Sequence, residues 1–431
     1  MYDKFKHKSA KKVKAYIGSI SPFCVSSGIY MKREEIEEIK RKRLKFTLKY
    51  VYENCEFYRK KFEGINLDRI TPEKIHKLPF TTKQDLRNAY PLKMSCVPKD
   101  RIVRIQMSGG TTGQPVIVPY TRKDVYQWRE MVLRAFQIAG ITSKDVIQIT
   151  PAFGLWNGGF GFHFAADAIN AFIIPVGPGN TRNQIRFMLD FGTTVLCATA
   201  SYPLRIAEVA EELGIKASEL PVEKMLLGAE PWSDEMRKMI EETFDAITFD
   251  IPGLTEMGGV GTVGFECPLR KGLHMWEDNY IVEVVDPKTG EPLDEGEEGE
   301  IVYTAINREA MPLIRYRSGE VSEIVSKEKC ECGIEHITLK RIKGRTDDMI
   351  IHSGVKFYPS DVESVLARYG IAHYKIEVGS NVRVLFEGDP ALVPRISRDF
   401  REFIGINPEI VPLQKGQIER FEGKAKRLVR V

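Results

Sequence analysis

Between residues 100 and 300, short runs of β-branched residues alternate with longer stretches whose apolar residues recur at helical spacing. The strand-like runs are VIQIT, AFIIPV, TVLCAT and AITFDI, and typical helical stretches are SYPLRIAEVAEELG and SDEMRKMIEETF. This alternation predicts strand–helix units and a parallel sheet. The run VEVVDPKTGEPLDEGEEGEIVYT follows, and its two strand patterns around Gly and Pro predict an antiparallel hairpin joined to the α/β core.

The two ends of the chain have different patterns. Residues 31–62 place apolar side chains at helical spacing in a charged background, which predicts one amphipathic helix. Residues 1–30 form a basic N-terminal extension, and the Lys-rich run within the first 50 residues is interpreted as a solvated helix face. After Gly344 a turn, a strand, a loop and a helix are predicted, with Ser360 as N-cap and Glu363 three positions on. We therefore expect domains over 31–343 and 344–431.

Length and composition limit the classes of protein. A chain of 431 residues exceeds the size of a single hydrophobic core. Hydrophobic residues make up 43% and charged residues 28%, and no stretch approaches the roughly 20 apolar residues of a membrane span. The start lacks a convincing cleavage site, so we expect a cytoplasmic protein with no membrane partner. A net charge of +4 does not indicate nucleic acid, and a homodimer stays open.

A Gly- and Thr-rich segment, Ser108-Gly-Gly-Thr-Thr-Gly-Gln-Pro115, directly follows a strand-like run. Its glycines let backbone N–H groups converge without Cβ clashes, and its hydroxyls add donors, which suits a polyphosphate. The segment lacks the Lys that a P-loop places before its last Ser or Thr. Such a segment is also typical of an ordinary turn, so its neighbours decide the interpretation.

Further motifs follow at wide separations: Gly228-Ala-Glu-Pro231, Gly253-Leu-Thr-Glu256, Arg315-Tyr-Arg-Ser-Gly-Glu320, Gly344-Arg-Thr-Asp-Asp348 and Gly423-Lys-Ala425. In this order they resemble the motif series of adenylate-forming enzymes, and their residues are similar to those of phenylacetate–coenzyme A ligases. The resemblance covers residues 33–431. It implies a large α/β adenylate-forming domain with parallel sheets and an appended antiparallel hairpin or small barrel, followed by a small mobile α+β C-terminal domain.

The resemblance also implies residue roles around ATP. The phosphate cradle would consist of Ser108, Gly109, Gly110, Thr111, Thr112 and Gly113. Glu256 would hold Mg²⁺, Thr255 would donate to the α-phosphate, and the turn of Gly228, Ala229, Glu230 and Pro231 would border the adenine. A hard carboxylate oxygen suits Mg²⁺, and phosphoryl-type chemistry depends mainly on positioning and charge neutralisation.

The remaining implied residues lie near and beyond residue 320. Glu320 takes the place of the Asp that binds the ribose in the family, and Arg345 would reach the ribose or phosphates. Lys424 would stabilise charge at the α-phosphate and the acyl carboxylate. Asp347 falls at the hinge about which the C-terminal domain would rotate between half-reactions.

Four metal-binding side chains form a separate group. Cys330-Glu-Cys332 lies in a short turn, and Cys267 and His274 lie upstream. Three Cys and one His complete a closed tetrahedral zinc site, and related ligases carry similar residues. His336 is a rival to His274. The other cysteines are scattered singly, so no disulfide framework is expected.

The segment from Ala152 to Gly161 corresponds to the family's acyl pocket. Phe153, Trp156 and Phe160 could form a flat wall for an aromatic acid, or ordinary core. The family's Tyr-Gly before this segment is Pro-Ala here, and Pro252 replaces the Tyr that stacks on adenine in the family.

The resemblance thus implies an AMP-forming acid–thiol ligase that uses ATP, Mg²⁺ and coenzyme A on an aromatic, phenylacetate-like acid. Three alternatives stay open. They are an adenylyltransferase that stops after the first half-reaction, such as one acting on a deazaflavin coenzyme; acyl transfer to a carrier protein; and a non-catalytic scaffold that kept the fold.

Overall fold

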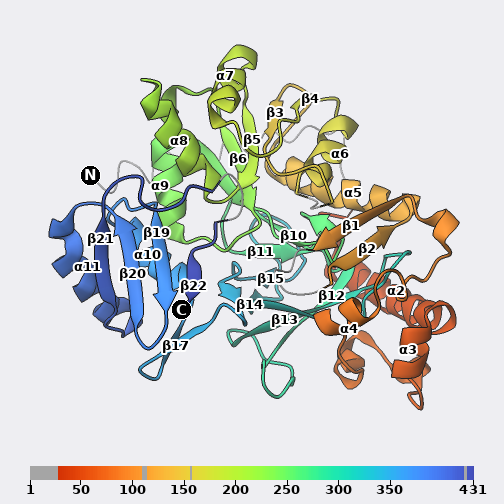
Figure 1. Cartoon of the computed structure of the whole chain (residues 1–431). Coiled ribbons are helices and arrows are strands. Elements are labelled where there is room, and N and C mark those ends of the chain that lie inside the picture. The colour runs from red at the N-terminus through yellow and green to blue at the C-terminus, as the bar shows by residue number, and fades with distance from the viewer. Residues whose placement is uncertain (1–27, 109–113, 156–157, 422–424) are drawn as a thin grey trace.

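In the computed structural model, the described residues are 28–108, 114–155, 158–421 and 425–431. Their centre is the predicted parallel sheet, with strand order β4-β3-β5-β6-β7 (Figure 1). The strands are β3 (Val146–Ile149), β4 (Phe172–Ile174), β5 (Val195–Thr199), β6 (Lys224–Gly228) and β7 (Ile247–Asp250). Among the described residues, no helix is long and apolar enough to cross a membrane.

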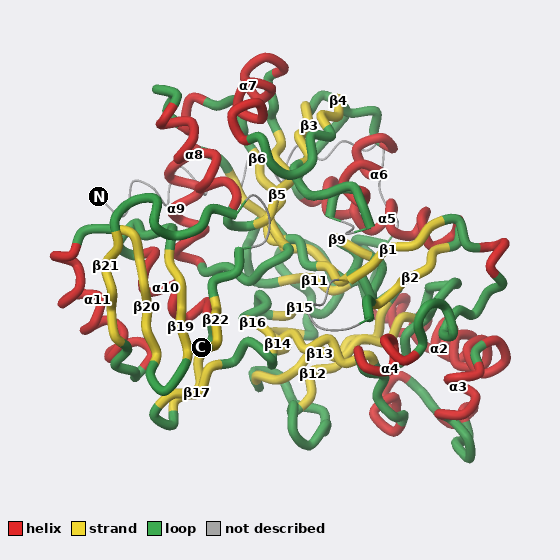
Figure 2. The backbone as a smooth tube through the Cα atoms, viewed as in Figure 1, coloured by secondary structure: helices red, strands yellow, loops and turns green. Residues whose placement is uncertain are grey.

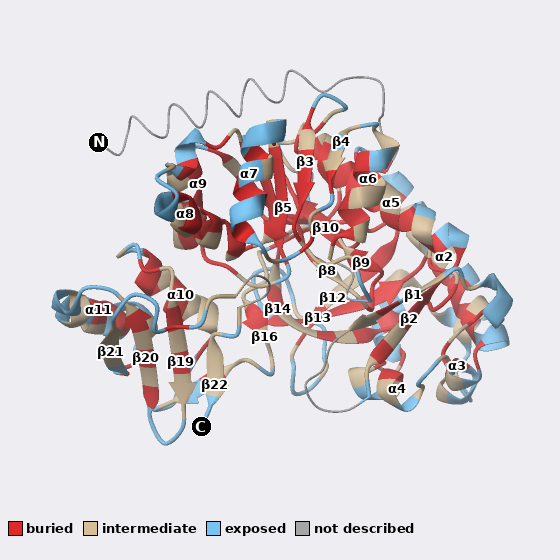
Figure 3. Cartoon of the chain, turned by 45° about the horizontal axis from the view of Figure 1, so that its top comes forward, coloured by how far each residue is buried: buried red, intermediate tan, exposed pale blue. Residues whose placement is uncertain are grey.

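Helices cover both faces of this sheet. Along β5, Val195 and Cys197 enter one hydrophobic core, while Leu196 and Ala198 enter another. Figure 3 shows this strand buried within the layers. The period-two alternation of strand side chains explains the division. Helices α5 (Arg122–Ile138) and α6 (Phe160–Ala168) belong to the first core, and α7 (Thr181–Phe191), α8 (Tyr202–Glu212) and α9 (Asp234–Phe244) to the second.

The predicted antiparallel hairpin is confirmed as β12 (Tyr280–Val285) and β13 (Glu298–Ala305). It belongs to a seven-stranded sheet of order β10-β11-β15-β14-β13-β12, with β16 paired to β14 (Figure 2). The described strands do not close into a barrel. The other strands are β10 (Gly264–Glu266), β11 (Leu273–Met275), β14 (Tyr316–Ser326), β15 (Thr338–Leu339) and β16 (Gly344–Arg345).

The single helix predicted over residues 31–62 is two helices. α2 (Arg33–Asn54) ends at Cys55, whose backbone is extended (φ −129°, ψ 113°), and α3 (Glu56–Lys61) follows. Helix α4 (Lys83–Asn88) begins with a capping box made by Thr82 and Asp85. Two short hairpins complete this part: β1 (Arg104–Ser108) with β2 (Val116–Tyr120), and β8 (Gly253–Leu254) with β9 (Gly259–Val260).

The C-terminal segment, defined here as residues 344–431, contains a four-stranded sheet of order β21-β20-β19-β22. Its elements are β17 (Ile350–His352), β18 (Val355–Phe357), α10 (Pro359–Ala367), β19 (Tyr374–Val378), β20 (Val382–Glu387), α11 (Val393–Asp399), β21 (Glu409–Leu413) and β22 (Leu428–Arg430). Residues between Ile350 and Ile406 form a core of their own.

The predicted N-cap of the helix near residue 360 is wrong by two residues. α10 begins at Pro359, with Tyr358 as N-cap, and the Asp361 carboxylate accepts the Tyr358 N–H at 2.8 Å. Pro suits the first helical position because it has no N–H to satisfy there. Ser360 donates to the Lys343 carbonyl, and Glu363 accepts from the Ser233 N–H at 2.8 Å. These two polar side chains therefore join the C-terminal segment to the residues before it.

Candidate active site

Glu256 joins two segments that are far apart in the sequence. The Ser108 hydroxyl, at the end of β1, donates to the Glu256 carboxylate at 2.8 Å. Lys83, at the first position of α4, places its Nζ 3.3 Å from the same carboxylate oxygen. The Glu256 side chain is only 4% exposed, so its charge is held largely out of water by these two partners.

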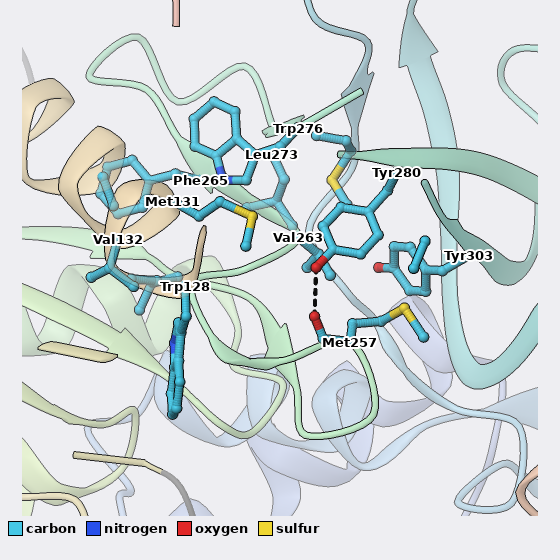
Figure 4. Close-up of a cluster of buried hydrophobic side chains, with 14 of the residues drawn as sticks. Trp128, Met131, Val132, Met257, Val263, Phe265, Leu273, Trp276, Tyr280 and Tyr303 are labelled. Carbon is cyan, nitrogen blue, oxygen red and sulfur yellow. Dashed lines mark hydrogen bonds between the residues drawn. The ribbon is translucent and has the colours of Figure 1, made fainter. Parts of the chain in front are cut away.

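The hydrophobic core fixes the backbone next to Glu256. Met257 is fully buried, and its carbonyl accepts a hydrogen bond from the Tyr280 hydroxyl (Figure 4). Trp128 and Met131 of α5 pack in the same cluster. Because the residue after Glu256 is held by packing and by a hydrogen bond, the carboxylate has a well-defined position.

Tyr316 interacts with the Glu256 carboxylate and also with Glu320 and Arg345. Glu320 on β14 pairs directly with Arg345 on β16. Burial and the negative charge of Glu256 raise the pKa of Tyr316 well above its ordinary value, while Arg345 lowers it. Arg345 donates to the Ser318 carbonyl at 3.3 Å and to Asp347 at 2.9 Å. Two predicted ribose or phosphate residues, Glu320 and Arg345, are therefore neighbours.

The turn from Gly228 to Pro231 follows β6 at the carboxyl edge of the parallel sheet, where open α/β sheets bind ligands. A Cβ on Gly228 would lie 2.4 Å from the Ile251 carbonyl, and Ala229 has a φ of +71°. The backbone at Gly228 therefore lies too close to the Ile251 carbonyl for a side chain, and Ala229 adopts a left-handed conformation. The Glu230 carboxylate accepts from the Ser201 hydroxyl at 2.6 Å and from the Ala425 N–H at 3.1 Å.

Two of the three predicted acyl-pocket residues are described. Phe153 and Phe160 meet edge to face, with ring centroids 5.5 Å apart. The Arg104 guanidinium lies over the Phe160 ring at 4.1 Å and over the Phe164 ring at 5.0 Å. The Phe160 ring is therefore stacked with a cation.

Several predicted residues lie outside the described part of the chain. They are Gly109, Gly110, Thr111, Thr112, Gly113, Trp156 and Lys424. Thr255 is described and lies in the turn between β8 and β9, directly before Glu256. The side chain of Asp347, the predicted hinge residue, is 68% exposed.

The four predicted metal ligands are brought together. One ligand atom from each of Cys267, His274, Cys330 and Cys332 lies within 4.8 Å of the others. Burial lowers the pKa of His274, but hydrogen bonds to the sulfurs of Cys267 and Cys330 outweigh burial and raise it to about 9. Thr338 lies 3.2 Å from His274 Nδ1, which leaves Nε2 facing Cys332 at 3.4 Å. Three sulfurs and one imidazole nitrogen fit a tetrahedral zinc ion.

The rival ligand His336 has other partners. Its Nε2 lies 2.7 Å from the Gly28 carbonyl, and its Nδ1 accepts the Glu277 N–H at 3.2 Å. Both ring nitrogens are therefore engaged outside the cysteine cluster. His274 is the histidine of the cluster.

Sequence reasoning missed Lys83 and Arg104. Lys83 lies in Phe80-Thr-Thr-Lys-Gln-Asp85, which reads only as a helix start. Arg104 lies at the first position of a five-residue strand. Nothing in the local pattern marks either residue, because each contact is made with a segment more than 50 residues away.

Comparison with known proteins defines the class. Residues 40–307 match the model of the AMP-binding enzyme family, and the chain belongs to that family. Curated relatives include the phenylacetate–coenzyme A ligase of Thermus thermophilus, 36% identical over 92% of this chain and 96% of the relative. The phenylacetate–coenzyme A ligase of Escherichia coli (strain K12) is 35% identical, over 92% of this chain and 94% of the relative.

Solved structures show the same fold. A 2-hydroxyisobutyryl-CoA ligase in its post-adenylation state, in complex with 2-HIB-AMP, matches with a TM-score of 0.89 and 23% identity. The match covers 96% of this chain and 94% of that chain. The same ligase in the thioesterification state, in complex with 2-HIB-AMP and CoA, matches with a TM-score of 0.72. The adenylate-forming fold expected from the motifs is confirmed.

Proposed function

We propose that this chain is an ATP-dependent, AMP-forming acid–coenzyme A ligase that acts on an aromatic, phenylacetate-like acid. The observation that carries the proposal is the contact of Ser108 and Lys83 with the buried Glu256 carboxylate. This contact gathers hydroxyl, cation and carboxylate groups in a chain that belongs to the AMP-binding enzyme family. Relatives that are phenylacetate–coenzyme A ligases support the choice of acid and thiol.

The first half-reaction joins the acid to AMP. A carboxylate oxygen of the acid attacks the α-phosphorus of ATP, and the bond to the β-phosphate breaks to release pyrophosphate. Glu256 would hold Mg²⁺ against the phosphates, and Ser108 and Lys83 would contact the same phosphates. Glu320 and Arg345 would bind the ribose side, with Thr255 donating to the α-phosphate. Positioned charges of this kind supply most of the rate enhancement in phosphoryl-type chemistry.

The second half-reaction transfers the acyl group to sulfur. The coenzyme A thiolate attacks the acyl carbonyl, and the bond to the phosphate oxygen of AMP breaks. Lys424 would stabilise charge during adenylation. Rotation of the C-terminal segment about Asp347 would then move Lys424 away and let the thiol reach the acyl carbonyl. Phe153 and Trp156 would line the acyl pocket.

We also propose a structural zinc ion on Cys267, His274, Cys330 and Cys332. The support is the mutual distance of the four ligand atoms and the bond from Thr338 to the outer nitrogen of His274. The set leaves no coordination position for a substrate, so the ion would stabilise the fold and take no part in the reaction.

The test is product analysis with purified protein, Mg-ATP, coenzyme A and a panel of arylacetic, benzoic and short-chain acids. We expect AMP, pyrophosphate and thioester in equal amounts, with the highest kcat/KM for an arylacetic acid. Lys424→Ala should abolish adenylation, while Lys415→Ala, an exposed lysine of the same segment, should not. Pyrophosphate without thioester would indicate an adenylyltransferase or a carrier-protein acceptor, and no turnover with any acid would contradict the proposal.

A further inference from the structure

Helix α8 holds the C-terminal segment through one carboxylate. Glu208 accepts from Arg420 Nη2 at 2.9 Å and from Arg420 Nε at 3.1 Å. Arg420 stands four positions before Lys424 in the sequence. Figure 1 shows α8 and α9 lying between the parallel sheet and the C-terminal strands. A two-point bond from a guanidinium to a carboxylate fixes direction as well as distance.

The Glu208–Arg420 pair is nearly buried and belongs to a network. The side chain of Glu208 is 10% exposed and that of Arg420 is 16% exposed. Arg205 contacts Glu208 at 2.6 Å from the same helix, and His373 approaches it at 3.6 Å from the C-terminal segment. Burial opposes ionisation of Glu208, but hydrogen bonds from His373, Arg420 and Arg205 hold the pKa of its carboxyl well below the usual range. The Glu208 carboxylate is thus charged, and Arg420 is its partner from the C-terminal segment.

Arg420 has a second carboxylate within its own segment. Glu387, at the end of β20, accepts from Arg420 Nη2 at 2.6 Å and from the Ile418 N–H at 2.6 Å. Glu387 and Arg420 would travel together if the C-terminal segment moved, and Glu208 and Arg205 would stay behind together. Arg420 therefore keeps Glu387 and Glu208 keeps Arg205 after separation. No buried charge is left without a partner of opposite sign.

Glu230 makes a second attachment on the other side of Lys424. Its carboxylate accepts the Ala425 N–H at 3.1 Å, and Ala425 directly follows Lys424 in the sequence. The Ser201 N–H and hydroxyl, at 2.8 and 2.6 Å, hold the other oxygen of the same carboxylate. Glu230 is therefore oriented from within the large α/β part of the chain.

We propose that Glu208 and Glu230 are positioning residues that hold the segment bearing Lys424 in the arrangement for adenylation. Their bonds to Arg420 and Ala425 break when the thiol-transfer arrangement forms. This inference rests on the proposed function. It also gives Glu230 a role other than bordering the adenine, because both of its carboxylate oxygens face Ser201 and Ala425.

Measuring the two half-reactions separately distinguishes a positioning role from a general loss of activity or folding. Glu208→Gln and Glu230→Gln should each slow acid-dependent ATP–pyrophosphate exchange by about tenfold, since hydrogen bonds to charged groups contribute at this level. Transfer from preformed acyl-adenylate to coenzyme A should stay within about twofold or become faster. Glu211→Gln, the same charge change at an exposed position of α8, should leave both rates unchanged. Equal loss in both half-reactions, or no loss in either, would overturn the proposal.

A crosslink gives a second readout that needs no catalysis. Ser364 Oγ donates to Glu235 at 2.7 Å across the contact between α10 and α9. The pair Glu235→Cys and Ser364→Cys should be bridged by a short bismaleimide, and adding Glu208→Gln should slow bridging by about tenfold. Adding Glu211→Gln should not. If no acid is adenylated yet bridging still depends on Glu208, the proposed function fails and the attachment stands; bridging independent of Glu208 would contradict the attachment.

Discussion

At the scale of single residues, the position of the Glu256 carboxylate depends on packing between segments that are far apart in the sequence. It lies in the turn between two short strands, and the Tyr280 hydroxyl and core packing hold its neighbour Met257. Its own carboxylate meets a hydroxyl from β1 and an ammonium from α4. A carboxylate in this position serves a cation site better than it serves stability, because burying its charge costs free energy.

Replacing Glu256 by Gln should lower the rate of acid-dependent ATP–pyrophosphate exchange by about 100-fold or more, since the carboxylate that would hold Mg²⁺ at the phosphates is lost. Glu277→Gln is the matched control: Glu277 is a buried carboxylate paired with Arg33 at 2.8 Å, outside the named motifs. That variant should lose about 3 kcal/mol of unfolding free energy and keep its exchange rate at temperatures where it is folded. Exchange that survives in Glu256→Gln would remove this residue from the proposed mechanism.

Phe153 gives a prediction about the acid. Phe153→Ala should raise the KM for an arylacetic acid about tenfold and leave the KM for ATP unchanged, because buried contact area with the ring is lost. Phe172→Ala, an aromatic that is 51% exposed on β4, should change neither constant. Steady-state kinetics with each substrate varied in turn decides the matter, and a rise in the KM for ATP alone would argue against an acyl pocket at Phe153.

The site residues that could be predicted from the sequence are those that lie inside a recognisable motif. Ser108 with Glu256, and Glu320 with Arg345, are brought together as the motifs imply. Lys83 and Arg104 were not predictable, because their contacts arise only when α4 and β1 pack against distant elements. The break at Cys55 was also missed, since helical spacing continues across it while the backbone becomes extended.

At the scale of elements, the cysteine cluster ties the residues between β10 and β11 to the turn between β14 and β15. A metal would join these two segments with four bonds.

The cluster predicts roughly one zinc per chain in protein purified without chelator. Cys330→Ser should lose the ion and lower the Tm, because the remaining ligands no longer complete a tetrahedral site. Cys197→Ala is the control, as its thiol is buried in the parallel sheet away from the cluster; it should keep its zinc even if its Tm falls. Metal analysis by mass spectrometry is the measurement, and wild-type protein that folds fully without zinc would refute the proposal.

At the scale of the whole molecule, the described strands form a parallel sheet, an antiparallel sheet and a C-terminal sheet, besides three two-stranded hairpins. The alternation of strands and helices predicted the first sheet, and two strand patterns around Gly and Pro predicted the hairpin of the second. The order β4-β3-β5-β6-β7 and the seven-stranded extent of the second sheet were not predictable, because strand order depends on contacts between elements and not on local pattern. The attachment of Arg420 and Ala425 to large-domain carboxylates likewise appears only in three dimensions.

The central claim is that the acid attacks the α-phosphorus of ATP, and isotope transfer tests it most directly. With phenylacetate labelled by ¹⁸O in both carboxylate oxygens, Mg-ATP and coenzyme A, the AMP released with the thioester should carry one ¹⁸O from the acid. Mass spectrometry of the AMP gives the answer in one turnover. Unlabelled AMP formed with thioester, or ¹⁸O found in inorganic phosphate with ADP as product, would contradict an acyl-adenylate intermediate.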